Sequence, residues 1–127
     1  MEYAFTKKVE YPFDEALART KEALKAEGFG ILTEVDVKET MKKKLDAQYE
    51  NYIILGACNP PLAHASLQVK KNIGLFLPCN VIVYEEDGTV FVEAIRPSAA
   101  MSIVENDELA KIAAQAEDKL KTVIDAV

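Results

Sequence analysis

The sequence predicts an α+β fold in which an antiparallel sheet carries two long helices on one face, with a short helix after the third strand. Two stretches near the chain ends repeat apolar residues with a helical period, and residues 29–95 contain four strand-like segments. Asp87-Gly88 lies between the last two segments and is a strong signal for a tight hairpin turn. The predicted order is therefore β-α-β4-α. A doubly wound fold fits less well, because it would need a helix between successive strands.

The first strand and the first long helix are predicted near the N-terminus. Tyr3 to Val9 has the character of a first or edge strand. Pro12 suits a first helical position, and the acidic Asp14 and Glu15 suit the positive end of a helix. One buried helical face follows, made by Phe13, Leu17, Thr20 and Leu24. Gly28 is predicted to end this helix.

The next two strands differ in their apolar pattern. Phe29 to Val37 alternates with a period of two, which predicts a half-buried strand with Ile31, Thr33, Val35 and Val37 on one side and Glu34 and Asp36 on the other. A short basic segment, Lys38 to Leu45, follows it. Gln48 to Cys58 contains a run, Tyr52 to Leu55, that is apolar on both faces. This run predicts a central strand that is covered on both sides or lies in an oligomer interface.

A short helix, a hairpin and a long helix are predicted in the second half. Asn59 is a good N-cap, and Pro60 and Pro61 suit the first positions of a helix to about Val69. Residues 72–78 lead back to the sheet. The turn at Asp87-Gly88 sets the register of a hairpin over 79–95, which pairs Glu86 with Thr89, Tyr84 with Phe91 and Cys79 with Arg96. The last helix is capped near Ser102 or Asn106 and has an apolar face of Leu109, Ile112, Ala113, Ala116, Leu120, Val123 and Ile124.

Bulk composition limits the function classes. With 127 residues, half of them apolar, the chain is expected to form one domain over residues 1–127. The net charge of −6 disfavours a nucleic-acid partner. The longest uncharged apolar run, Tyr52 to Leu62, is too short to cross a membrane, and the N-terminus lacks an apolar signal core, so we expect a cytoplasmic protein with no membrane partner. The two cysteines are expected to be thiols there.

Cys58 is the strongest chemical feature of the sequence. It lies just before the cap of the predicted short helix, where partial positive charge and free N–H groups favour a thiolate. Pro60 and Pro61 weaken this effect, because they remove two of the N–H donors and leave a poor phosphate cradle. The alternative is a buried cysteine with a structural role only.

Cys79 and His64 are weaker candidates. The hairpin register sets Cys79 across from Arg96, a cation that would favour its thiolate. The alternative makes Cys79 a core residue and Arg96 a solvated strand end. His64 follows Pro60 by one helical turn, and it either lines a pocket between helix and sheet or is an ordinary surface histidine.

Other chemistries receive less support. Cys58, His64 and Cys79 supply three ligands, as a catalytic zinc site does, but their spacing matches no common metal signature. Other catalytic patterns are missing, namely a Gly-rich phosphate loop, a nucleophile elbow and a second histidine for base catalysis. No cofactor is predicted. Asn59 and Asn80 each follow a cysteine, so their amides are able to bind a small polar ligand, or they serve only as a cap and a turn residue.

Two motifs carry a resemblance to a known family. Gly56 to His64 reads GACNPPLAH, and Leu77 to Asn80 reads LPCN. With these motifs the chain resembles the family of domain of unknown function 302 over essentially its whole length. The resemblance implies a fold like that of TATA-binding-protein repeats and a homodimer. It implies no activity, since a shared fold does not define function.

These observations lead to four hypotheses. The first is a homodimeric module with a small-ligand pocket formed by Cys58, Asn59, His64, Cys79, Asn80 and Arg96. The second is a thiol-based redox or nucleophilic enzyme, with Cys58 as nucleophile, Cys79 as resolving thiol and His64 as proton acceptor. The third is a metal carrier or sensor that uses the same three residues. The fourth is an assembly domain in which the motif only shapes the dimer core.

Overall fold

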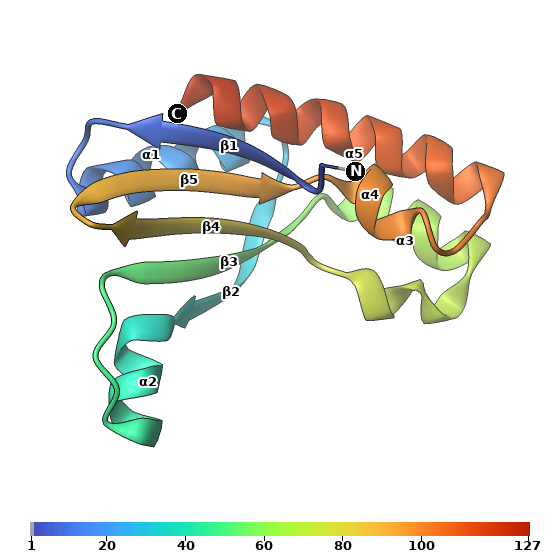
Figure 1. Cartoon of the computed structure of the whole chain (residues 1–127). Coiled ribbons are helices and arrows are strands. Elements are labelled where there is room, and N and C mark those ends of the chain that lie inside the picture. Colours follow the sequence, from blue (N-terminus) through green and yellow to red (C-terminus); the bar gives the residue numbers. More distant parts are fainter. Residues whose placement is uncertain (1) are drawn as a thin grey trace.

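A computed structural model describes residues 2–127 and contains one five-stranded antiparallel sheet in the order β1-β5-β4-β3-β2 (Figure 1). The strands are β1 (Ala4–Val9), β2 (Gly30–Asp36), β3 (Tyr52–Cys58), β4 (Cys79–Glu86) and β5 (Thr89–Ile95). The helices are α1 (Phe13–Ala26), α2 (Val37–Leu45), α3 (Pro60–Val69), the short 3-10 helix η1 (Lys71–Phe76), α4 (Pro97–Met101) and α5 (Asp107–Ala126). The predicted fold class and element order are confirmed.

The two long helices, α1 and α5, pack on one face of the sheet and on each other. They enclose a core of alternate strand residues, among them Leu55, Val83 and Val92, which are fully buried. Leu24 of α1 and Leu120 of α5 fill the space between the layers. No helix among residues 2–127 is long and apolar enough to span a membrane.

The first helix begins one residue later than the sequence predicts. Pro12 is its N-cap, not its first helical residue, while Asp14 and Glu15 do lie in the first turn. The buried face contains Leu24 and also Thr20, whose hydroxyl donates a hydrogen bond of 2.7 Å to the carbonyl oxygen of Ala16. This bond explains how a polar residue is accommodated in the apolar stripe. Gly28 lies just beyond the helix with φ of 82°, as a helix-ending glycine does.

The strand predicted over 29–37 is present as β2, but the prediction that it is half-buried is wrong. Nearly all of β2 is exposed, because it lies at an edge of the sheet. A bulge between Ile31 and Thr33 also breaks the alternation, so Ile31 lies across from Ala57 while Thr33 lies across from Gly56 on the other face. Val37 belongs to α2, not to the strand.

The sheet face opposite the long helices is apolar and is not crossed by a helix in the view of Figure 1. We call it the open face and define it by Tyr52 and Ile54 of β3, Ile82 and Tyr84 of β4, and Phe91, Glu93 and Ile95 of β5, which alternate with core residues. The rings of Tyr52, Tyr84 and Phe91 stack in a row with centroids 5.3 Å apart at each step. This explains why the run Tyr52 to Leu55 is apolar on both faces.

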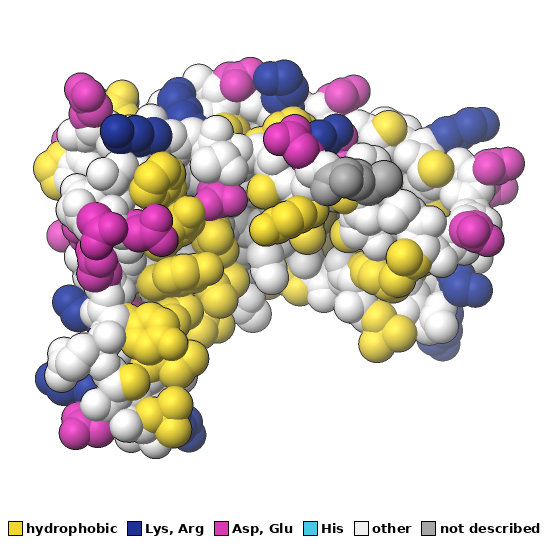
Figure 2. Space-filling model, in the orientation of Figure 1, with side chains coloured by type: hydrophobic (Ala, Val, Ile, Leu, Met, Phe, Trp, Pro, Cys, Tyr) yellow, Lys and Arg dark blue, Asp and Glu magenta, His cyan; other side chains and the backbone are white. Residues whose placement is uncertain are grey.

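The basic segment after β2 forms a helix, α2, that projects from the β2–β3 edge of the sheet (Figure 1). It has no buried residue, and Leu45 at its end is 72% exposed. Figure 2 shows hydrophobic side chains in a continuous band from the sheet down onto this helix. The band is the most extended apolar area in this view.

The hairpin has the predicted register, with Glu86 paired with Thr89 and Tyr84 paired with Phe91. Its turn residues, Asp87 and Gly88, have φ of 52° and 81°, as a type I′ turn requires. Asn106 caps the last helix by accepting a hydrogen bond from the N–H of Leu109 at 3.0 Å. Three helices, α2, α4 and η1, have no counterpart among the predicted elements.

Candidate functional site

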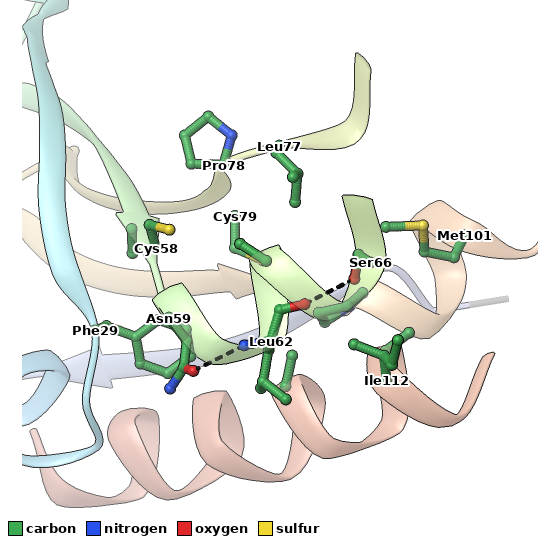
Figure 3. A pocket seen from close by; sticks show the side chains of 15 residues that line it. Phe29, Cys58, Asn59, Leu62, Ser66, Leu77, Pro78, Cys79, Met101 and Ile112 are labelled. Carbon is green, nitrogen blue, oxygen red and sulfur yellow. Dashed lines mark hydrogen bonds between the residues drawn. The ribbon is translucent and has the colours of Figure 1, made fainter. Parts of the chain in front are cut away.

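A partly open cavity of about 40 Å³ lies where the end of β3 and the start of β4 meet α3, α4 and α5 (Figure 3). We call it the inner cavity. Three of the six predicted site residues line it, namely Cys58, Asn59 and Cys79. The remaining lining is mostly apolar and consists of Phe29, Ala57, Leu62, Ala63, Ser66, Leu77, Pro78, Pro97, Met101, Ile112, Ala113 and Ala116.

A larger depression of about 300 Å³, which we call the outer groove, lies beside the inner cavity. The two share five lining residues, which are Leu77, Pro78, Cys79, Pro97 and Met101. Asn80 and Ile95 line the outer groove but not the inner cavity. Cys79 therefore stands on the boundary between the two spaces, and a fourth predicted site residue, Asn80, belongs to the same region.

Cys79 is held as a neutral thiol by its surroundings. Burial, with a smaller effect of the negative charge that Cys58 would carry, raises the pKa of Cys79 to about 11. Arg96 does not offset this, because its guanidinium lies against Glu117. The predicted activation of Cys79 by Arg96 is therefore wrong.

The two cysteines are both free and half-buried, and they are offset across the sheet. The residue that pairs with Cys79 on β3 is Ala57, not Cys58. Paired residues point to the same side of an antiparallel sheet and consecutive residues point to opposite sides. The strand register alone therefore does not set the two thiols face to face.

Asn59 joins α3 to the end of α1. Its Oδ1 accepts a hydrogen bond from the N–H of Leu62 at 3.4 Å, as predicted for an N-cap, and its Nδ2 donates to the carbonyl oxygen of Glu27 at 3.4 Å. The hydroxyl of Ser66 donates to the carbonyl oxygen of Leu62 at 2.9 Å. Because these polar side chains are engaged inside the protein, the thiols are the lining groups left to contact a ligand.

The structure does not bring His64 or Arg96 into the cavity. His64 is exposed on α3, and neither residue lines the inner cavity or the outer groove. Nε and Nη2 of Arg96 donate to Oε2 of Glu117 at 3.3 Å and 3.2 Å. The sequence did not predict this pairing, because Glu117 lies 21 residues further along the chain, in α5.

The predicted metal ligands are also dispersed. Among residues 2–127, no three His, Cys, Asp or Glu side chains are grouped closely enough to hold a metal ion. Cys58, His64 and Cys79 thus do not form the three-ligand site considered from the sequence.

Several lining residues were not singled out from the sequence. Met101 and Pro97 belong to α4, which the sequence did not predict. Ala113 and Ala116 were assigned only to a helical core stripe, but their small side chains leave space opposite α3. The spacing of three residues between Ala113 and Ala116 was the one feature of the sequence that could have indicated this space, because it puts two small side chains on the same face of the helix.

The comparisons with known proteins concern the family and the fold. Residues 5–127 match the family described as "Domain of unknown function DUF302". The chain is also similar to a solved structure of an uncharacterized conserved DUF302 protein from Bacillus stearothermophilus, with 32% sequence identity and a TM-score of 0.93. That similarity covers 99% of this chain and 98% of the other. No curated protein matches this chain.

Proposed function

Given that this chain belongs to the DUF302 family, whose description names no activity, we propose from its cavities that it is a small-ligand-binding module. The ligand is mainly apolar, enters through the outer groove and reaches the inner cavity beside Cys79. The observation that carries the proposal is that Cys79 lines both spaces, which are otherwise mostly apolar. The outer groove, at about 300 Å³, is at the lower end of the size range of small-molecule sites.

This proposal modifies the polar ligand expected from the sequence. The amide of Asn59 and the hydroxyl of Ser66 are already hydrogen-bonded within the protein, so a polar ligand would find few partners in the inner cavity. Thiols are weak hydrogen-bonding groups that pack well against apolar atoms. The lining therefore favours a ligand with an apolar end, with Asn80 available to a polar group in the outer groove.

A thiol-based enzyme has less support than ligand binding. Cys79, the resolving thiol in that hypothesis, has a pKa of about 11 and is almost entirely protonated at neutral pH, so it is a poor partner for thiol exchange. His64, the proton acceptor in that hypothesis, lies on the exposed side of α3, outside both spaces.

Binding is tested by following backbone amide resonances during titration with benzene as an apolar probe and acetamide as a polar probe. Benzene is expected to shift the amides around Cys79, Asn80 and Met101 selectively, because the outer groove, at about 300 Å³, has room for it. Ala100→Leu, which fills the outer groove from α4, should abolish the shifts. Ala65→Leu lies on α3 outside both linings and should leave them intact. Equal shifts in both variants, or none with benzene in the unmodified protein, would contradict the proposal.

We further propose that the module is a cytosolic homodimer that associates through the open face and α2. Contiguous apolar areas on a protein surface commonly mark interaction sites. Besides Leu45 of α2, three apolar side chains in the neighbouring chain segments are exposed: Leu32 of β2 by 66%, Val35 of β2 by 42%, and Tyr49 of the α2–β3 connection by 47%. A nine-residue helix with no buried residue is marginal in water and gains stability from packing against a partner. Free thiols are usual in the cytosol.

The dimer is tested by sedimentation equilibrium on two matched variants. Ile82→Glu places a charge at the centre of the open face and is expected to give a monomer. Ile103→Glu makes the same change at a residue that is 76% exposed in the α4–α5 connection, and it should preserve the dimer. A monomeric unmodified protein at all concentrations would refute the dimer.

A further inference from the structure

The outer groove opens onto the open face. Asn80 lies two residues from Ile82 along β4, and Ile95 lies two residues from Glu93 along β5. Because side chains two apart in a strand point to the same side, Asn80 and Ile95 both belong to the uncovered side of the sheet. Both also line the outer groove. One end of the proposed association surface is therefore a wall of the proposed ligand site.

The opposite wall of the groove is apolar and unusually exposed. It is formed by η1, where Leu75 is 82% exposed. This is a large apolar side chain beside a groove that is itself mostly apolar. In one chain, the outer groove has these two walls and is partly open to water.

The charges on and beside the open face favour a second copy of the same chain as the molecule that covers the open face and the outer groove. Glu93 accepts hydrogen bonds from the hydroxyls of Thr6, at 3.0 Å, and of Tyr84, and forms no ion pair within residues 2–127. At the other end of the surface, the last turn of α2 carries Lys42 and Lys44, which also form no ion pair within the described chain. A two-fold axis between the two ends of this surface would set Glu93 of each copy towards Lys42 and Lys44 of the other, which is the reciprocal pairing of a two-fold interface.

We propose that the second copy covers the outer groove, so that the ligand site is complete only in the dimer. This inference rests on the proposed binding function and the proposed dimer. It makes the two events interdependent: a ligand held between two protomers strengthens their association, and association strengthens ligand binding by the same factor. Cys79, at the boundary of both spaces, then becomes less accessible on association.

The accessibility of Cys79 provides the test. Its reaction with methyl methanethiosulfonate is followed by peptide mass mapping at pH 9, at protein concentrations far above and far below the dimer dissociation constant from sedimentation. Cys79 is expected to react about tenfold more slowly in the dimer, because access limits thiol exchange. Ile82→Glu should react at the fast rate at every concentration, and Ile103→Glu should behave like the unmodified protein.

The outcomes separate this inference from the proposals beneath it. If the unmodified protein dimerises but Cys79 reacts at one rate at all concentrations, the partner does not cover the groove, although the dimer stands. If the protein is a monomer throughout, the dimer itself fails. Slower reaction on dilution would also overturn the inference, since it would mean that association opens the groove.

Discussion

Replacing Gly56 by alanine is expected to lower the free energy of unfolding by about 2 kcal/mol, which corresponds to about 8 °C in Tm for a chain of this size. A Cβ at this position of β3 would overlap Oγ1 of Thr33 and lie 2.9 Å from Cγ of Pro78. The ring of Pro78 is rigid, so relief requires movement of the segment that leads into β4. The result is measured by urea unfolding followed by circular dichroism.

Two further variants test this explanation of the Gly56 effect. Gly74→Ala introduces the same methyl group where nothing lies within 4 Å, so it should leave stability nearly unchanged. Adding Thr33→Ala to Gly56→Ala removes one of the two obstacles and should recover part of the loss. A Gly56→Ala protein as stable as the original would mean that Thr33 and Pro78 are free to move apart.

The second large effect is a loss of stability at alkaline pH, which the raised pKa of Cys79 causes. Burial, with a smaller effect of the Cys58 charge, raises the pKa of Cys79 from 9.0 to about 11. Above pH 9 the unfolded chain releases this proton before the folded protein does, so the free energy of unfolding falls as pH rises. The fall continues to about pH 11 and amounts to about 3 kcal/mol. It is measured by urea unfolding at intervals from pH 7 to pH 11.

Cys79→Ala should reduce stability at pH 7 by leaving a small cavity, but it should flatten the alkaline part of the curve. Cys58→Ala should retain most of the alkaline fall, because burial is the larger cause of the shift in Cys79. Tyr84 adds a fall of its own in every variant, since its hydrogen bond to Glu93 raises the pKa of its phenol. Identical slopes with and without Cys79 would show that this thiol titrates normally.

Local signals were sufficient for most of the fold. The turn at Asp87-Gly88 defines its own register, and Asn59 and Asn106 are helix caps whose partners lie three residues away. The strand β2 was misjudged because alternation along a strand does not say whether a helix covers it. The bulge near Leu32 adds one residue to the strand, and every residue after it then points to the opposite face. No local sequence pattern predicted this bulge.

The candidate site was less predictable than the fold. Cys58, Asn59, Cys79 and Asn80 were grouped from the sequence as the Cys-Asn pairs of two motifs, and the pairing of β3 with β4 brings those motifs together. Arg96 was misassigned because its cross-strand position was taken to decide its partner, whereas its long side chain extends to Glu117 on α5. The cavity itself depends on small residues of α5 and on α4, which are set by tertiary packing.

The edges of the sheet bear on what kind of assembly this chain forms. An unpaired strand edge is a template for adding further strands, and such growth has no natural end. Here the β2 edge is interrupted by its bulge, and the β1 edge carries Lys7 and Lys8 in its middle. Both features discourage edge-to-edge pairing. In the proposed dimer, association uses the face of the sheet instead, where two copies cover each other's surface, so that assembly would be finite and fibres would be disfavoured.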